Sequence, residues 1–311
     1  MRIEDSVIAR PGVTGLALGA LGVLGFSFSL PATRLAVADL DPWFVAFGRA
    51  AIAGMLALAY LYGAGAPRPT VVQLRRLGLV ALGIVVGFPT FTSLALVTQT
   101  ASHGAVVIAC LPMATAVFAV LRADERPPSM FWLASGVGMI AVLGFIAVSG
   151  GLTGVPGLAD VFLLLAVLFA GLGYAEGGAL ARELGGGTTI ALALVLSLPV
   201  TVPVTLALAM TSSFVDVEPS AWLGFGYVTV VSMFLGFVAW YAGLARGGVA
   251  RVGQVQLAQP VLTLGWSVLL LGEQVGSATV LTAFAVVACV VWTQRARDYA
   301  APSTGVSKGR E

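Results

Sequence analysis

Two stretches of this chain share one pattern: ACLPMATAVFAVLRADE at residues 109–125 and LAQPVLTLGWSVLLLGE at residues 257–273. In both, a proline sits in apolar sequence, a glutamate follows 13 residues later, and another apolar run comes next. The two copies are offset by 148 residues, which predicts that the chain is an internal duplication. The residues that define the pattern are Pro112 with Glu125 and Pro260 with Glu273.

The sequence around these stretches is too apolar for a water-soluble protein. Of the 311 residues, 59% are hydrophobic and 10% are charged, whereas about 25% are charged in ordinary soluble proteins. The mean hydropathy is +1.00. Apolar runs of about 20 residues can cross a bilayer as helices, and runs of this length exclude transmembrane β-strands, which alternate in polarity. We therefore expect an all-α integral membrane protein.

Ten apolar runs predict ten transmembrane helices, with boundaries accurate to a few residues. Five helices per half is an odd number, so the two halves must cross the membrane in opposite directions, as in transporters with inverted repeats around a central cavity. The predicted helices are Gly12–Ala38, Trp43–Tyr62, Leu77–Thr98, Ala101–Leu121, Met130–Val148, Leu158–Leu180, Thr188–Met210, Ala221–Leu244, Val249–Leu271 and Ala278–Trp292. The halves are residues 12–150 and 157–297, and residues 298–311 form a tail.

Positive charge is distributed unevenly about these helices. Of the 16 lysines and arginines, all but Arg34 and Arg49 fall in loops, tails or a helix end on one side of the predicted membrane. Cytoplasmic loops carry the excess of positive residues in membrane proteins. We therefore expect both termini in the cytoplasm.

Several classes of function lack the residues they need. A net charge of +2 without a basic cluster excludes a nucleic-acid partner. The single lysine, Lys308, lies in the tail, and no Gly-rich phosphate loop precedes a lysine, which excludes a primary pump. His103 is the only histidine, and Cys110 and Cys289 lie in apolar runs. We therefore predict no metal site, no cofactor, no disulfide framework and no catalytic residue.

The repeated Pro and Glu pattern, the ten helices and two further motifs make the chain resemble the drug/metabolite transporter superfamily, in its EamA-type branch. The motifs are FGRAAIAG at residues 47–54 and QVQLAQP at residues 254–260. Within the superfamily the chain is most similar to the YddG-type exporters of aromatic and other amino acids. This resemblance implies a bacterial inner-membrane protein, monomeric in form, in which helices surround a central cavity.

The function that the resemblance implies is export of amino acids, aromatic ones included, from the cytoplasm by alternating access. Its partners would be amino-acid substrates and the lipid bilayer, and it would not be an enzyme. Three alternatives stay open: an exporter of drugs or other metabolites, a non-transporting membrane protein or channel, and an intramembrane hydrolase. Proton coupling and facilitated diffusion are also both open.

Among the ionisable residues within predicted helices, Arg49 and Glu176 stand out, because a charge there is costly and normally faces a cavity or a partner. Arg49 could extend toward Asp39 or Asp41, or it could bind a substrate carboxylate with its bidentate guanidinium. Glu176 could reach Arg182 at the inner interface, or it could bind an ammonium group or a proton. Arg49 and Glu176 lie at different depths along their two helices, so we do not expect them to pair with each other.

Other side chains at similar depth complete the candidate site, although helix packing alone would also account for small hydroxyls and aromatic rings. Three glutamines in one helix cannot all face lipid unpaired, so at least one should turn inward. The candidate substrate-binding residues are Ser27, Phe91, Thr92, Tyr174, Glu176, Trp240, Tyr241, Gln256 and Gln259. The candidate gating or coupling residues are Arg49, His103, Pro112 and Pro260.

Overall fold

A computed structural model describes residues 11–66, 68–123, 129–149, 157–247, 252 and 254–300. Within these ranges the chain forms helices joined by short loops and contains no strand, which confirms the all-α expectation. The helices of the first half are α1 (Pro11–Ser27), α2 (Ser29–Asp39), α3 (Pro42–Ala64), α4 (Val71–Val80), η1 (Ala81–Gly87), α5 (Phe88–Leu96), α6 (Ala101–Ile108), α7 (Leu111–Ala123) and α8 (Ser129–Ser149).

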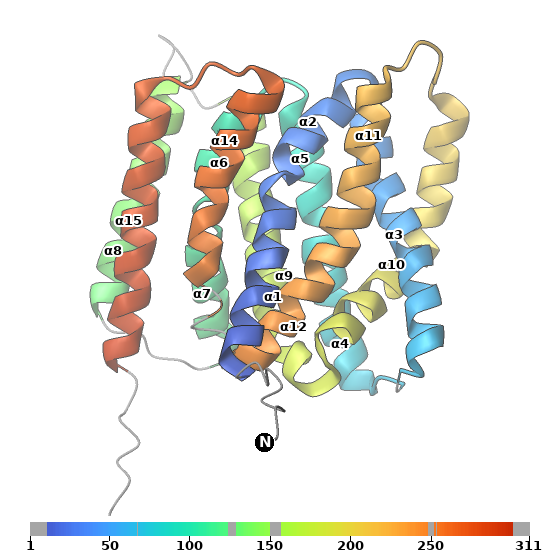
Figure 1. The fold of residues 1–311 in the computed structure, drawn as a ribbon, viewed down its shortest axis with the longest axis horizontal. Helices are drawn as coiled ribbons and strands as arrows, with labels where there is room; N and C mark the ends of the chain where they lie inside the picture. The colour runs from blue at the N-terminus through green and yellow to red at the C-terminus, as the bar shows by residue number, and fades with distance from the viewer. Residues whose placement is uncertain are drawn as a thin grey trace, which may run out of the picture.

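The second half continues with helices of 5 to 27 residues. They are α9 (Leu158–Leu184), α10 (Gly186–Thr211), α11 (Pro219–Tyr227), η3 (Val228–Leu235), α12 (Gly236–Gly247), η4 (Gln254–Ala258), α14 (Gln259–Leu271) and α15 (Ser277–Ala300). In Figure 1, α1 begins and α15 ends at the same edge of the bundle, the lower one. The helices α8 and α15 lie against each other at one end of the bundle, and α3 and α10 pack together at the other.

Six helical segments in the described residues are long and apolar enough to cross a bilayer, which indicates a multi-pass membrane protein. They are Val13–Asp39, Pro42–Ala64, Val71–Leu96, Leu158–Leu184, Gly186–Thr211 and Pro219–Arg246. Shorter apolar helices occupy Ala101–Thr115, Gln259–Leu271 and Ser277–Cys289. The count of ten transmembrane helices and the opposite orientation of the two halves stay predictions.

The first long segment is bent because of a proline. Pro31 has no N–H to donate to the carbonyl four residues earlier, that of Ser27. Accordingly α1 ends at Ser27 and α2 begins at Ser29. The freed Ser27 carbonyl accepts a hydrogen bond from Thr263 Oγ1 at 2.7 Å, which ties α14 to the bend. A carbonyl inside hydrocarbon needs such a partner.

Two predicted helices are interrupted where each carries its motif proline. The expected helix at residues 101–121 breaks after Ile108, and α7 starts at Leu111 with Pro112 in its first turn. The expected helix at residues 249–271 has a 3₁₀ segment, η4, before α14, which has Pro260 in its first turn. Proline is well tolerated in a first turn, where its missing N–H would have no intrahelical partner, so each proline marks a new start rather than a simple kink.

Two π-helical segments were not expected from the sequence. The segments η1 and η3 begin at Ala81 and Val228, 147 residues apart, and the motif prolines are 148 residues apart. A π-helix is rare and is found frequently at functional sites. The same rare geometry therefore recurs at nearly the same position of the two halves.

The π-helical segment η1 packs directly on the backbone of α9. A Cβ atom built on Gly83 would press on the carbonyl oxygen of Phe169 and would lie 2.8 Å from the backbone nitrogen of Gly173. Backbone atoms cannot rotate away as a side chain can. Any larger residue at this position would force η1 and α9 apart.

We expect Gly83→Ala to lower the melting temperature of the detergent-solubilised protein, because overpacking of this kind costs about 1–3 kcal/mol. Gly78→Ala is the matched control, since a Cβ there has nothing within 4 Å and alanine favours the helix over glycine by about 1 kcal/mol. Thermal unfolding followed by tryptophan fluorescence compares the two. Equal melting temperatures would contradict the close contact of η1 and α9.

Candidate functional site

A cavity lies in the interior where the broken helices meet, and we call it the central cavity. The centre of a water molecule can occupy about 20 Å³ of it, which is room for a water or two and too little for an amino acid. Any larger ligand therefore requires the surrounding helices to separate. The lining residues are Phe26, Ser29, Leu30, Arg49, Ile84, Phe88, Ile108, Leu111, Tyr174, Ser232, Met233, Phe237 and Gln259.

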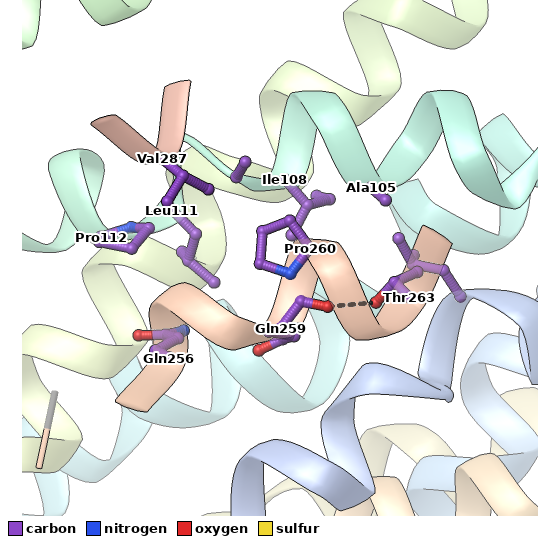
Figure 2. Close-up of a pocket in the computed structure, with 11 residues that line it drawn as sticks. Ala105, Ile108, Leu111, Pro112, Gln256, Gln259, Pro260, Thr263 and Val287 are labelled. Atoms are coloured by element: carbon purple, nitrogen blue, oxygen red, sulfur yellow. Dashed lines mark hydrogen bonds between the residues drawn. The ribbon is translucent and has the colours of Figure 1, made fainter. Parts of the chain in front are cut away.

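A second cavity adjoins the first, and we call it the proline cavity because Pro112 and Pro260 both line it (Figure 2). It shares four lining residues with the central cavity, so the two lie side by side at the helix breaks. The shared residues are Leu30, Ile108, Leu111 and Gln259. Gln256 lines only the proline cavity of the two.

Arg49 gives the central cavity a positive charge. Its side chain is 2% exposed. Its Nη1 donates a long hydrogen bond of 3.5 Å to Thr33 Oγ1, and its Nε is buried with no hydrogen-bond partner. The outer aspartates have other partners, since Asp41 accepts from the Phe44 N–H and Asp39 from the Glu218 N–H. No carboxylate is present among the described residues that line the cavity.

The rest of the polar lining is neutral. Ser29 Oγ and Ser232 Oγ lie 2.7 Å apart and link α2 to the π-helical segment η3. Gln259, the first residue of α14, has its side-chain Oε1 buried with no hydrogen-bond partner. With the phenol of Tyr174, the lining therefore combines one cation, three hydroxyls and one amide.

Aromatic rings form the other part of the lining. The Phe26 and Phe237 ring centroids are 4.7 Å apart, and the Tyr174 ring meets that of Phe237 edge-on at 5.9 Å. Phe88 also lines the cavity. Such rings offer an apolar surface to a ring-bearing ligand.

The structure separates the predicted substrate-binding residues into groups. Tyr174 and Gln259 line the central cavity, and Gln256 lines the proline cavity. The remaining ones line neither of these two cavities: Ser27, Phe91, Thr92, Glu176, Trp240 and Tyr241.

Other contacts account for most of these remaining side chains. Ser27 Oγ donates to the Leu24 carbonyl and accepts from Trp266 Nε1, and Thr92 Oγ1 donates to the Phe88 carbonyl. Phe91 stacks on Phe162 and Phe169. Trp240 and Tyr241 are buried in the core that α12 forms with α1 and α9. The depth of a residue along its predicted helix could not show whether its side chain packs in the core or lines the cavity.

Glu176 belongs to an ion-pair network at the edge of the bundle where α1 begins. Its side chain is 4% exposed, and its Oε2 lies 2.9 Å from Arg76 Nε. Arg76 also pairs with Glu183 at 2.9 Å, and Gln73 donates to Glu183. The sequence suggested Arg182, one and a half turns along the same helix, whereas the structure gives Glu176 this partner 100 residues away on α4. The network holds α4 against α9.

The opposite edge carries a second polar network. His103 Nε2 lies 2.6 Å from Asp160 Oδ1, and Asp160 Oδ2 accepts from the Gly157 N–H at the start of α9. The Glu273 carboxylate accepts from the Ala101 and Ser102 N–H groups at 2.8 and 2.9 Å and from the Ser102 hydroxyl.

The motif glutamate of the second half therefore caps α6, the helix that precedes the motif proline of the first half. The corresponding glutamate of the first half, Glu125, lies outside the described residues. The sequence pattern identified Glu273 as a repeated residue but gave no sign of this capping contact.

Known proteins support a family relationship. The sequence profile of the EamA-like transporter family matches residues 13–147 and again residues 157–294. The chain is 47% identical over 277 residues to a Bacillus subtilis (strain 168) protein named "Uncharacterized transporter YdeK", covering 89% of this chain and 96% of that protein. It also resembles a protein crystal structure with a TM-score of 0.61 at 17% identity, over 92% of this chain and 98% of that one, which shows a shared fold.

We expect Glu273→Gln to lower the melting temperature, because a neutral amide cannot accept from both backbone N–H groups and loses its charge interaction with the start of α6. The expected cost is about 1–2 kcal/mol. Glu218→Gln makes the same change at an exposed glutamate that forms no side-chain cap on α11, and it should leave the melting temperature unchanged. An equal response of the two variants would contradict the capping role.

Proposed function

Because the chain belongs to the EamA-like transporter family, we propose that this membrane transporter exports amino acids, aromatic ones among them, from the cytoplasm through the central cavity. The name of its Bacillus subtilis relative says that it is a transporter and does not state a substrate. Transporters are generally not enzymes, so membership of this family argues against an intramembrane hydrolase. The choice of substrate rests on the cavity itself.

The buried Arg49 carries this proposal. An ion taken out of water costs several kcal/mol unless a counter-charge compensates it, and no carboxylate lines the central cavity among the described residues. A substrate carboxylate would supply that counter-charge. Guanidinium binds carboxylates in bidentate geometry.

The same charge argues against the main alternative within the superfamily, an exporter of cationic drugs. A cationic drug in the central cavity would face the like charge of Arg49, and a like-charge contact of this kind costs several kcal/mol. A metabolite that carries a carboxylate or a phosphate would instead be attracted. The aromatic lining, with Phe26, Phe88, Tyr174 and Phe237, favours ring-bearing carboxylates among these anions.

Alternating access would proceed by rocking of two inverted five-helix halves about the central cavity. The recurrence of a broken helix and of a π-helical segment at nearly the same offset in both halves supports this arrangement. Separation of Arg76 from Glu176 would open one edge. Separation of Glu273 from Ser102 would open the other. We further propose a bacterial inner-membrane location, cytoplasmic termini and a monomeric form.

The test is transport by the purified protein in proteoliposomes with a panel of amino acids, cationic dyes and nucleotide sugars. Saturable counterflow of labelled phenylalanine or tryptophan would support the proposal and would distinguish a carrier from a channel. Counterflow of a cationic dye without any amino acid would overturn it.

We expect Arg49→Met to reduce the rate of phenylalanine counterflow at least tenfold, because hydrogen bonds to a charged group contribute about 1.5–3 kcal/mol. Arg34→Met is the matched control, since Arg34 donates to the Leu96 and Val97 carbonyls and lines neither cavity. It should keep most of the rate per folded protein. Wild-type counterflow in Arg49→Met would remove Arg49 from the binding site.

A further inference from the structure

Two residues that line the central cavity carry complementary polar atoms without a partner in the described protein. Arg49 Nε is a donor and Gln259 Oε1 is an acceptor, and both are fully buried. Buried polar side-chain atoms are nearly always hydrogen-bonded, so each exception requires an explanation. The three other buried unpartnered atoms belong to residues that line neither cavity: Ser93, Thr201 and Trp240.

We propose that Gln259 recognises the α-ammonium group of the substrate and so selects α-amino acids over carboxylates that lack an amine. This inference rests on the proposed function of the central cavity. A donor and an acceptor without partners in one cavity fit a ligand that brings an acceptor and a donor of its own. An α-amino acid brings both, as its carboxylate and its ammonium.

The backbone of Gln259 is held in place, which fixes where its side chain starts. Its carbonyl oxygen lies 2.9 Å from Thr263 Oγ1 (Figure 2). The same Thr263 hydroxyl lies 2.7 Å from the Ser27 carbonyl at the bend between α1 and α2. Pro260 follows directly and restricts the backbone further. The Gln259 side chain therefore starts from a fixed backbone position between the central and proline cavities.

A neutral acceptor suits this position better than a carboxylate would. A carboxylate in the same cavity would pair with Arg49 and remove the charge that attracts the substrate. The amide oxygen accepts from an ammonium group without competing for the guanidinium. A substrate without an amine would leave Gln259 Oε1 buried and unpaired, and the lost interaction corresponds to about a tenfold weaker uptake.

The experiment compares L-phenylalanine with 3-phenylpropionate, which has the same ring and carboxylate but no amine. Both are measured as competitors of labelled phenylalanine counterflow in the same proteoliposomes, so that the amount of folded protein cancels in the ratio. The wild type should prefer phenylalanine about tenfold. Gln259→Met, similar in length but without the acceptor, should bring the ratio close to one.

Gln99→Met is the matched control, because it makes the same change at a glutamine in the loop between α5 and α6 that lines neither cavity. It should keep the wild-type ratio. If Gln259→Met carries no substrate, Gln259→Asn, which keeps an amide on a shorter side chain, replaces it and should lower the ratio. An unchanged ratio in the variant that transports overturns the inference.

Measurements on the wild type alone distinguish failure of the Gln259 role from failure of the proposed amino-acid transport. Equal competition by phenylalanine and 3-phenylpropionate would overturn the role of Gln259 while leaving amino-acid transport in place. Absence of counterflow with phenylalanine and with every other amino acid of the panel would overturn the proposed function itself.

Discussion

Hydrocarbon offers no hydrogen bonds, and this single constraint explains most polar contacts in the bundle. Where Pro31 frees the Ser27 carbonyl, the Thr263 hydroxyl reaches it from another helix. Where Ser29 and Ser232 face the interior, they bond to each other. A chain that satisfies its buried groups so consistently makes the few unsatisfied ones informative. Under the proposed function, the substrate would supply the missing partners of Arg49 and Gln259.

The two polar networks at the edges of the bundle have one helix in common. At one edge α9 supplies Glu176 and Glu183 to Arg76, and at the other it supplies Asp160 to His103. In 27 residues α9 therefore connects both edges, and it passes the central cavity at Tyr174. Under the alternating access proposed above, α9 would transmit a movement that loosens one network to the other. Such linkage is what alternating access needs, since both edges must not open at once.

The sequence predicted the helical fold well because apolar runs act locally and mark the long helices. It did not predict the interruptions next to Pro112 and Pro260, where two single helices were expected. The pairing of Glu176 with Arg76 could not be predicted, because it joins residues 100 positions apart and depends on how α4 and α9 pack. Depth along a helix also could not tell on which side Trp240 faces.

The π-helical segments are positions where the fold could lose one residue and remain helical. In each of them the hydrogen bond spans five residues instead of four, so one turn contains one residue more than an α-helix requires. Removing that residue would restore an α-helix of nearly the same length while turning the residues beyond it around the axis. At η3 this would change which face carries Ser232. A one-residue deletion at such a position can thus alter specificity while the architecture survives.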